Sequence, residues 1–431
     1  MEVYHNTKVV DKNISPQIMA AACPNINQEQ INNLLQAVKE GLLAFSVTVG
    51  LNVIKTMMEE EVTQYVGPKG KHNSERKAYR HGKEQGQIVL GGRKVKIEHP
   101  RVRTIDGKEL VLQTYKMFHD EDILGQMAME RMLYGLSTRQ YSKGLEPVGS
   151  SLDVKDISKS TISRHFIERT KTALSEMLTR RLDSLDIVAL YIDGVVMADH
   201  TVIVAMGLDS DGYKHILGLW EGATENATIC KQLLTDLVDR GLCSDKGLLV
   251  IIDGSKALRA AVRDTFGQNA LVQRCQVHKK RNVLDHLPEN QHDWVKRKLD
   301  KAWNIEDASR AEKELKALAN ELHKDYPGAA ASLLEGLEET LTVKRLGLPD
   351  LLTRTLSSTN PIESAFDIVR SLSRNVKRWK NGEQVLRWSA AGLLEAEKHF
   401  HRINGYKDIP ILREALSWNI DGIKSHEGAL A

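Results

Sequence analysis

The sequence predicts an α/β protein in which a mixed sheet core is interrupted by an all-helical insertion. Between residues 184 and 276, apolar runs and amphipathic stretches follow in the order strand, strand, strand, helix, strand, helix, strand. The next stretch, 277–355, has a purely helical pattern. The N-terminal part is mostly helical and contains one small β hairpin.

Length and composition limit the class of protein. A chain of 431 residues with 41% apolar residues is long enough for two or three domains with real cores. We find no apolar run long enough to cross a membrane and no apolar segment of a secretory signal near the N-terminus. The four cysteines form no CxxC pair, which is typical of a reducing cytoplasm. We therefore expect a cytoplasmic protein without a membrane partner.

The N-terminal region is predicted to begin with two helices, one over 27–45 and one in the fifties. Two alternating runs then meet at Gly91-Gly92, which is a hairpin signal, and residues 109–118 could add a third strand. This β unit could contact nucleic acid or be purely structural, and the sequence leaves both possibilities open.

Residues 121–180 are predicted to be all-helical. A short helix ending near Gly144 or Pro147 is followed by a turn and a second helix capped by Ser158 or Ser160. That succession is typical of a helix-turn-helix, whose second helix reads the major groove of DNA, although many packed helix pairs share it. On the DNA-binding interpretation, the residues that reach base edges are Ser163 and Arg164.

The strand and helix order over 184–276 is that of a ribonuclease-H-like core. In this order the first and fourth strands lie side by side, so Asp193 and Asp253, each predicted to end its strand, become neighbours. A third carboxylate, Glu363, lies about one turn into a helix that we expect to begin with Asn360 as cap and Pro361 as first residue. Leu315, Leu318, Leu333 and Leu334 are among the residues expected on the apolar helix faces of the insertion.

Three carboxylates brought together in this way can hold two divalent metal ions. Oxygen ligands suit Mg²⁺, with Mn²⁺ as a substitute, and a pair of such ions supports phosphoryl transfer. Each piece also has a structural interpretation. Asp-Gly is a turn dipeptide, and a glutamate in the first turn of a helix can complete a capping box.

Residues from about 120 to 402 resemble the catalytic region of the Mutator-type family of bacterial insertion-sequence DDE transposases. The matching text is "YIDGVV", "GATENATICKQLLTDLVDRGL", "VIIDGSKAL", "QRCQVHKKRNV", "SSTNPIES" and "VKRWKNGEQVLRWSAAGLLEAEKHF". The resemblance implies that Asp193, Asp253 and Glu363 form the metal-binding and catalytic triad, and that Cys275 and His278 are the family's Cys-x-x-His element. The first 120 residues resemble the family only loosely.

The resemblance also implies an activity and partners. These are cleavage and joining of DNA at terminal inverted repeats, a homodimer or larger synapse, and a copy-out-paste-in route at the bacterial nucleoid, with no small-molecule substrate. Two alternatives remain. One is a ribonuclease-H-fold nuclease or resolvase that cuts without joining, and the other is a non-catalytic DNA-binding regulator.

The resulting division of the chain is an N-terminal helical region (1–80), a small β unit (81–120), a helix-turn-helix-like DNA-binding region (121–183), the first part of the core (184–276), the helical insertion (277–355), the second part of the core with the Glu363 helix (356–402) and a C-terminal tail (403–431).

The Cys275–His278 pair allows two interpretations. It could ligate zinc, but a tetrahedral site needs four ligands and no second pair has suitable spacing. A packed cysteine, with His278 hydrogen-bonding near the active site or near a DNA phosphate, explains the pair better. The neighbouring cations would add positive charge for DNA; they are Arg274, Lys279, Lys280 and Arg281.

A second basic run extends from the Glu363 helix. Four cations are spaced so that they would share one helical side, namely Arg370, Arg374, Lys377 and Arg378. They could follow DNA phosphates or form an ordinary solvated face, and we favour the phosphate role. We expect Trp388 in the core and leave Trp379 open between core packing and base stacking.

Overall fold

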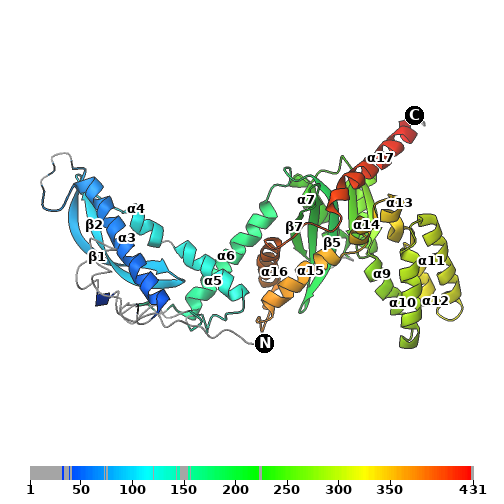
Figure 1. Ribbon diagram of the computed structural model, residues 1–431, viewed down its shortest axis with the longest axis horizontal. Coiled ribbons are helices and arrows are strands. Elements are labelled where there is room, and N and C mark those ends of the chain that lie inside the picture. The colour runs from blue at the N-terminus through cyan, green and yellow to red at the C-terminus, as the bar shows by residue number, and fades with distance from the viewer. Residues whose placement is uncertain are drawn as a thin grey trace, which may run out of the picture. The chain divides into compact units, whose positions relative to one another are not determined.

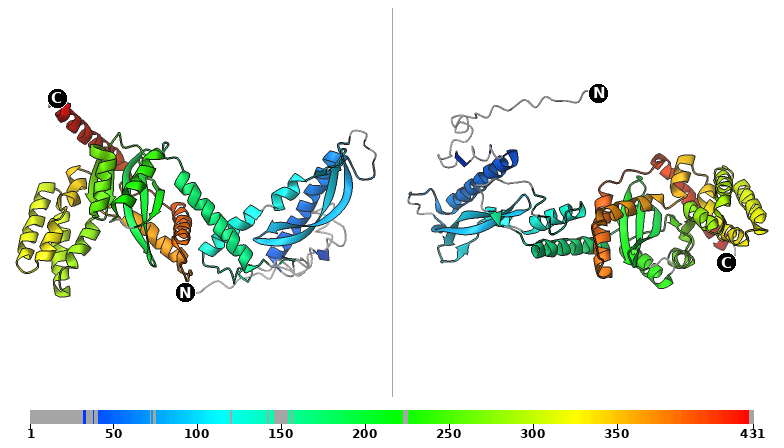
Figure 2. Two further views of the ribbon diagram at one scale, coloured as in Figure 1. Left: turned by 180° about the vertical axis from the view of Figure 1, so that it is seen from behind. Right: turned by 90° about the horizontal axis from the view of Figure 1, so that it is seen from below.

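The computed structural model describes residues 41–428 except 72, 74, 75, 120, 142, 146–153, 156 and 223–225, together with residues 32, 33 and 38. The chain divides into two compact units, Met1–Arg169 and Thr170–Ala431. Figures 1 and 2 show the elements of each unit. Within the described residues, no helix is long and apolar enough to cross a membrane.

The first unit is built on a helix packed against a hairpin. The helix α3 (Leu42–Val66) contacts both β1 (Ala78–Leu90) and β2 (Arg93–Thr104), and their apolar side chains form one cluster. Gly91 and Gly92 connect the strands with φ of 56° and 77°, angles that glycine adopts without strain. The predicted hairpin and the predicted helix in the fifties are thus confirmed, while the helix expected over 27–45 lies mainly outside the described residues.

The expected third strand over 109–118 is wrong beyond its first two residues. After β3 (Glu109–Leu110) the chain forms the helix α4 (Gln113–His119). The carboxylate of Glu61 accepts hydrogen bonds from the first two backbone N–H groups of α4, at 2.7 and 2.9 Å. A distant carboxylate therefore caps this helix, which local strand propensity does not reveal.

Residues 121–180 are not all-helical. The helices α5 (Glu121–Leu133) and α6 (Lys159–Thr179) form, but β4 (Val154–Lys155) pairs with β2. The short helix expected before α6 is absent from the described residues 137–145, which form turns instead. Tyr141 explains this in part, because it is buried and its hydroxyl donates to Gly92 O at 3.3 Å. Ser158 does cap α6, since its Oγ accepts from Thr161 N at 3.2 Å.

The second unit contains a five-stranded mixed sheet with the spatial order β7-β6-β5-β8-β9. The first three strands are antiparallel, whereas β5, β8 and β9 are parallel. The strands are β5 (Ile187–Met197), β6 (His200–Asp209), β7 (Lys214–Glu221), β8 (Leu248–Ile252) and β9 (Ala270–Arg274). With α7 (Ala227–Asp239) and α8 (Lys256–Phe266) between strands, the predicted element order is confirmed.

Helices cover both faces of this sheet (Figure 1). Side chains alternate along β5, so Tyr191 packs on one face and Ile192 on the other. One face packs against α7 and α8. The other packs against α14 (Asp350–Leu356), α15 (Asn360–Ser373), α16 (Gly382–Glu397) and α17 (Ile409–Gly428).

Between β9 and α14 the chain is helical, as predicted. It forms α9 (Gln276–Leu284), α10 (Glu289–Trp303), α11 (Ala308–His323), α12 (Pro327–Leu334), the 3₁₀ turn η2 (Glu338–Leu341) and α13 (Thr342–Arg345). The helices α9 to α12 and the turn η2 share their own apolar cluster, which includes Leu315, Leu318 and Leu333, whereas Val343 of α13 packs in the cluster of the sheet. Leu334, expected on the same face, is instead 47% exposed, because α12 ends there and the chain turns.

Candidate active site

Two strands of the sheet bring Asp193 and Asp253 to neighbouring positions. Ile192 pairs with Ile252 in the parallel β5–β8 register, so the residues that follow them are adjacent. Asp253 directly follows β8 as predicted, but β5 continues through Asp193 to Met197, so the prediction that Asp193 ends its strand is wrong. Valines 195 and 196 continue the β pattern, and Gly194 pairs with Ile203.

Each of these two carboxylates accepts a hydrogen bond from a backbone N–H group. Gly194 N donates to Asp193 Oδ1 at 2.8 Å, and Ser255 N donates to Asp253 Oδ1 at 3.0 Å. The Asp193 residue is only 5% exposed, so its carboxylate is largely removed from water.

The third carboxylate, Glu363, comes from the first turn of α15. The expected cap, Asn360, is the first residue of the helix, and the N-cap is Thr359, with Pro361 second in the helix. The Thr359 hydroxyl donates to Glu363 Oε1 at 2.9 Å, which turns this carboxylate back toward the sheet. Glu363 does not complete a capping box, because Thr359 N donates to Cys275 Sγ instead, at 3.4 Å.

Cys275 joins the end of the sheet to the segment that precedes α15. Its backbone N–H donates to Ile252 O at 2.8 Å, and the next N–H, of Gln276, donates to Ser357 O at 2.9 Å. Its buried Sγ accepts hydrogen bonds from Thr359 and from His278 N. These contacts match the prediction of a packed cysteine.

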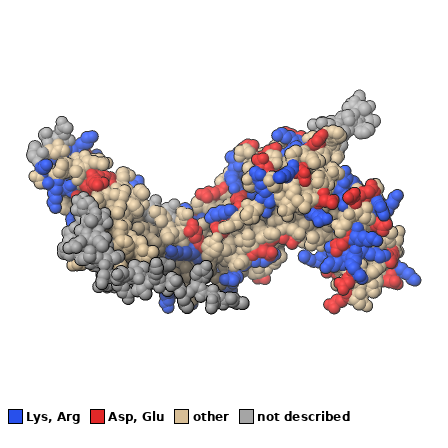
Figure 3. Space-filling view, viewed as in Figure 1, with Lys and Arg blue, Asp and Glu red and all other residues tan. Residues whose placement is uncertain are grey.

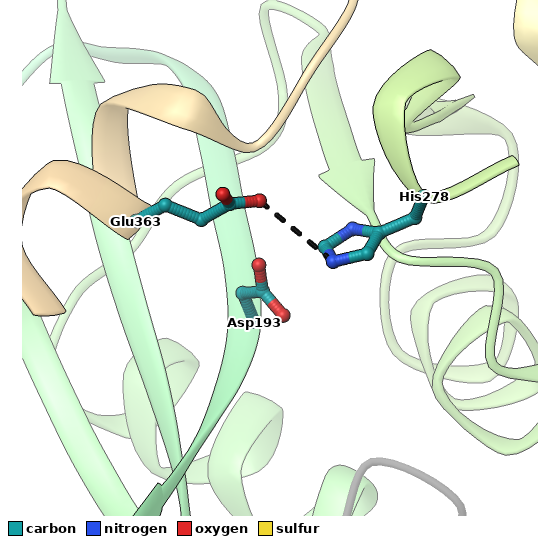
Figure 4. Close-up of side chains that lie close together, drawn as sticks. All are labelled: Asp193, His278 and Glu363. Carbon is teal, nitrogen blue, oxygen red and sulfur yellow. Dashed lines mark ion pairs between the residues drawn. The ribbon is translucent and has the colours of Figure 1, made fainter. Parts of the chain in front are cut away.

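The imidazole of His278 points toward the carboxylates of Asp193 and Glu363 (Figure 4). Its Nδ1 is 3.3 Å from Thr359 Oγ1, and its Nε2 is 3.7 Å from Glu363 Oε1. One ligand atom each of Asp193, His278 and Glu363 lies within 4.8 Å of the others, a spacing suited to a metal ion. Asp253 is next to Asp193 but is not a member of this set.

The electrostatics of the site are strongly perturbed. Burial raises the pKa of Asp193 to about 6, against the opposing effect of the His278 charge. A hydrogen bond with Cys275, together with the charges of Cys275, Asp193 and Glu363, raises the pKa of His278 to about 9 despite its burial. Burial alone would raise the pKa of the Cys275 thiol, but hydrogen bonds from His278 and Thr359 outweigh it and lower that pKa. The imidazolium of His278 therefore offsets the charge of the carboxylates.

The donor atoms fit a hard divalent cation. Carboxylate oxygens suit Mg²⁺ or Mn²⁺, and the buried Asp193 carboxylate is the kind of group that a bound cation stabilises. Asp193 and Glu363 are the residues that would hold such an ion, with Asp253 adjacent. Sequence reasoning missed the central role of Thr359, although it lies in the matched stretch "SSTNPIES".

Two cations that were predicted to contact DNA beside the triad are buried, so their side chains are not at the surface where DNA would bind. Arg274 and Lys279 are 4% and 2% exposed. Lys279 Nζ donates to Ser332 O and Glu335 O, at 2.6 and 2.7 Å, and burial lowers its pKa to about 8. Arg274 Nη1 donates to Glu335 O at 3.1 Å. Arg274, at the end of β9, therefore fixes the helical insertion to the sheet, whereas Lys279 joins α9 to the end of α12 within the insertion.

The other two cations of this run are at the surface. Lys280 is partly buried and pairs with Asp300, whereas Arg281 is exposed.

The predicted basic face of the Glu363 helix is also corrected. α15 ends at Ser373, so Lys377 and Arg378 lie beyond it and share no helical side with Arg370. Arg370 pairs with Asp367 at 2.8 Å, whereas Arg374, Lys377 and Arg378 are exposed.

The chain leaves the helix so that Trp379 can pack edge-to-face on Trp388, with ring centroids 6.3 Å apart. Trp388 is in the core as predicted, and Trp379 packs against that core.

Ser163 and Arg164 lie in the first unit, on α6. Arg164 is exposed and Ser163 is partly buried. Their predicted role in reading DNA stays a prediction.

Comparison with known proteins places the chain in a protein family. The model of the Mutator family of transposases matches residues 23–402. The chain is therefore a member of the Mutator family of transposases.

Three relatives illustrate the similarity. The transposase for insertion sequence element ISRM5 of Rhizobium meliloti (strain 1021) is 30% identical over 84% of this chain and 91% of its own length. The transposase for IS6120 of Mycolicibacterium smegmatis is 31% identical over 57% of this chain and 75% of its own. The transposase for IS256 in transposon Tn4001 of Staphylococcus aureus is 25% identical over 86% and 94%.

Proposed function

We propose that this chain is a DDE transposase that cuts and joins DNA at the ends of an insertion sequence by metal-dependent phosphoryl transfer. Asp193, Asp253 and Glu363 are the proposed ligands of Mg²⁺ or Mn²⁺, on a ribonuclease-H-like core. The observation that carries the proposal is the β5–β8 register, which makes the two aspartates neighbours, together with the Thr359 hydrogen bond that directs Glu363 toward them.

In the proposed reaction, water first attacks a phosphodiester at the element's end and releases a 3′-OH. That hydroxyl then attacks a second phosphodiester, so each step forms one P–O bond and breaks another. When bound, two divalent ions would stabilise the attacking and leaving oxygens. Thr359 orients Glu363, and His278, with a pKa of about 9, holds a proton at Nε2 beside that carboxylate.

This mechanism requires no covalent protein–DNA intermediate, so no serine or tyrosine nucleophile is needed. Recognition of terminal inverted repeats, action as a homodimer, a copy-out-paste-in route and association with the nucleoid complete the proposal.

The test uses labelled DNA duplexes carrying the element's ends. Asp193→Asn, Asp253→Asn and Glu363→Gln keep the shape of the side chain but remove the charge that a divalent cation requires. Each should abolish Mg²⁺-dependent nicking and strand joining while leaving DNA binding intact. Asp199→Asn, which changes an exposed aspartate in the turn after β5, is the matched control and should behave as wild type.

The outcomes separate the function classes. Wild-type protein that cuts but never joins would identify a nuclease, and protein that only binds would identify a regulator. Strand joining retained by any of the three variants would remove that residue from the proposed metal site.

A further inference from the structure

A polar pocket of about 490 Å³ lies between the helical insertion and the core of the second unit. Lys280, Trp303 and Asn304 line it from α9, α10 and the end of α10. Lys344 and Arg354 also line it, together with Ser357, Ser358 and Asn360.

The pocket is built from the same two segments as the candidate active site. Gln276 and Lys280 lie on the helix that also carries His278. Ser358 and Asn360 flank Thr359 in the sequence, and both line the pocket. None of Asp193, His278 and Glu363 lines the pocket, so a ligand held there would lie close to the candidate active site but outside it.

The charges in the pocket favour an anion. Three cations face two carboxylates in its lining, and one cation, Lys280, is already paired with Asp300. Lys344 and Arg354 form no ion pair within 4 Å in the part of the chain that the structure describes, and burial lowers the pKa of Lys344. Asp350 also lines the pocket and acts on Lys344 without forming an ion pair with it. The two cations, one of them costly to desolvate, are placed to bind a phosphate group.

The volume of the pocket and the uncharged polar residues that line it indicate what the ligand carries besides a phosphate. The volume exceeds what a phosphate alone needs and lies within the range of pockets for small organic ligands. Hydrogen-bonding side chains, including Asn304, Ser358 and Asn360, could pair with the edge of a base. A base pair within a duplex cannot enter such a pocket, whereas one unpaired nucleotide can.

Exposed basic side chains also gather on the helical insertion. In the view of Figure 3, Lys and Arg side chains gather on the helical insertion. The exposed cations of α9 and α10 include Arg281, Lys296, Arg297 and Lys301. A polyanionic strand would be attracted toward this side of the insertion.

We propose that this pocket receives one unpaired nucleotide of the substrate DNA strand, next to the phosphate that reacts. Lys344 and Arg354 bind its phosphate, and the amide and hydroxyl side chains contact its base. The inference rests on the proposed function and extends it, because it requires local unpairing of the DNA at the reacting end.

The experiment scans end-bearing duplexes with 2-aminopurine, whose fluorescence rises when the base leaves the stack. One position next to the cleavage site should brighten severalfold on binding wild-type protein. The double variant Lys344→Ala/Arg354→Ala should lose most of that rise and about tenfold in strand cleavage, since a mispositioned strand reacts slowly. The control Arg310→Ala/Lys313→Ala changes two exposed cations of α11 outside the pocket and should match wild type.

Failure of the inference is distinguishable from failure of the proposed function. If wild-type protein cuts the DNA but no position brightens, or if the double variant brightens DNA as wild type does, the pocket does not hold a nucleotide. The scan of wild-type protein decides this even if the double variant is unstable. The inference would also be overturned if free deoxynucleoside monophosphates bind wild-type protein and the double variant equally tightly and no DNA position brightens. Absence of all cutting would contradict the proposed function instead.

Discussion

Thr359 is the residue that holds the candidate active site together. It is fully buried, and its hydroxyl contacts Cys275 Sγ, His278 Nδ1 and Glu363 Oε1. A side chain that orients metal ligands in this way acts through them rather than on the substrate. Removing its hydroxyl should therefore weaken catalysis without unfolding the sheet.

Thr359→Val keeps the branched shape and removes the hydroxyl, whereas Thr359→Ser keeps the hydroxyl. We expect Thr359→Val to slow Mg²⁺-dependent strand cleavage by about 10- to 100-fold, the usual effect of losing a residue that orients a metal ligand. Thr359→Ser should recover most of the rate. Cleavage rates at saturating DNA, with thermal unfolding as the control for folding, measure this. A valine variant as active as wild type would contradict the positioning role.

At the level of single residues, the three carboxylates were predictable from the sequence, but the residues that orient them were not. Asp193, Asp253 and Glu363 each lie in a short sequence motif that can be recognised locally. The position of His278 facing two of them depends on a contact with Thr359, which is distant in the sequence. No local pattern encodes a hydrogen bond across such a separation.

At the level of elements, strand and helix identities were predictable, but several ends were not. β5 passes through Asp193 because the residues after it pair with β6. α15 stops at Ser373, although the spacing of basic residues suggested a longer helix. For β5 the pairing with β6 decides where the strand ends, and after α15 Trp379 packs on Trp388 outside any helix.

The segment after α15 should supply DNA affinity that is independent of sequence. Lys377→Ala with Arg378→Ala removes two exposed cations. If both contact phosphates, affinity for all DNA should fall, and the slope of log K against log[salt] should flatten by about 0.9 per lost contact.

Binding titrations from low to moderate salt test this, with Arg310→Ala/Lys313→Ala as the charge-matched control. An unchanged slope would mean that Lys377 and Arg378 face solvent or a protein partner.

At the level of the whole molecule, the order of elements and the presence of a helical insertion were predictable from hydrophobic periodicity. The attachment of that insertion was not. Buried Arg274, at the end of β9, binds a backbone carbonyl of the insertion, and buried Lys279 joins α9 to the end of α12, although their sequence context resembles a DNA-binding basic run. A separate backbone hydrogen bond, from Gln276 N to Ser357 O, joins α9 to the segment before α15, and these two segments contribute to both the candidate metal site and the pocket.

The central claim is that three carboxylates, including Asp253, hold the metal. Mn²⁺ binding to the purified chain, measured by calorimetry, tests it most directly, with His278→Gln and Asp199→Asn measured alongside. We predict that Asp193→Asn, Asp253→Asn and Glu363→Gln each weaken Mn²⁺ binding by at least about tenfold, since each removes a charged oxygen ligand. Unchanged binding in Asp253→Asn, with binding abolished in His278→Gln, would instead identify Asp193, His278 and Glu363 as the metal site and contradict the account.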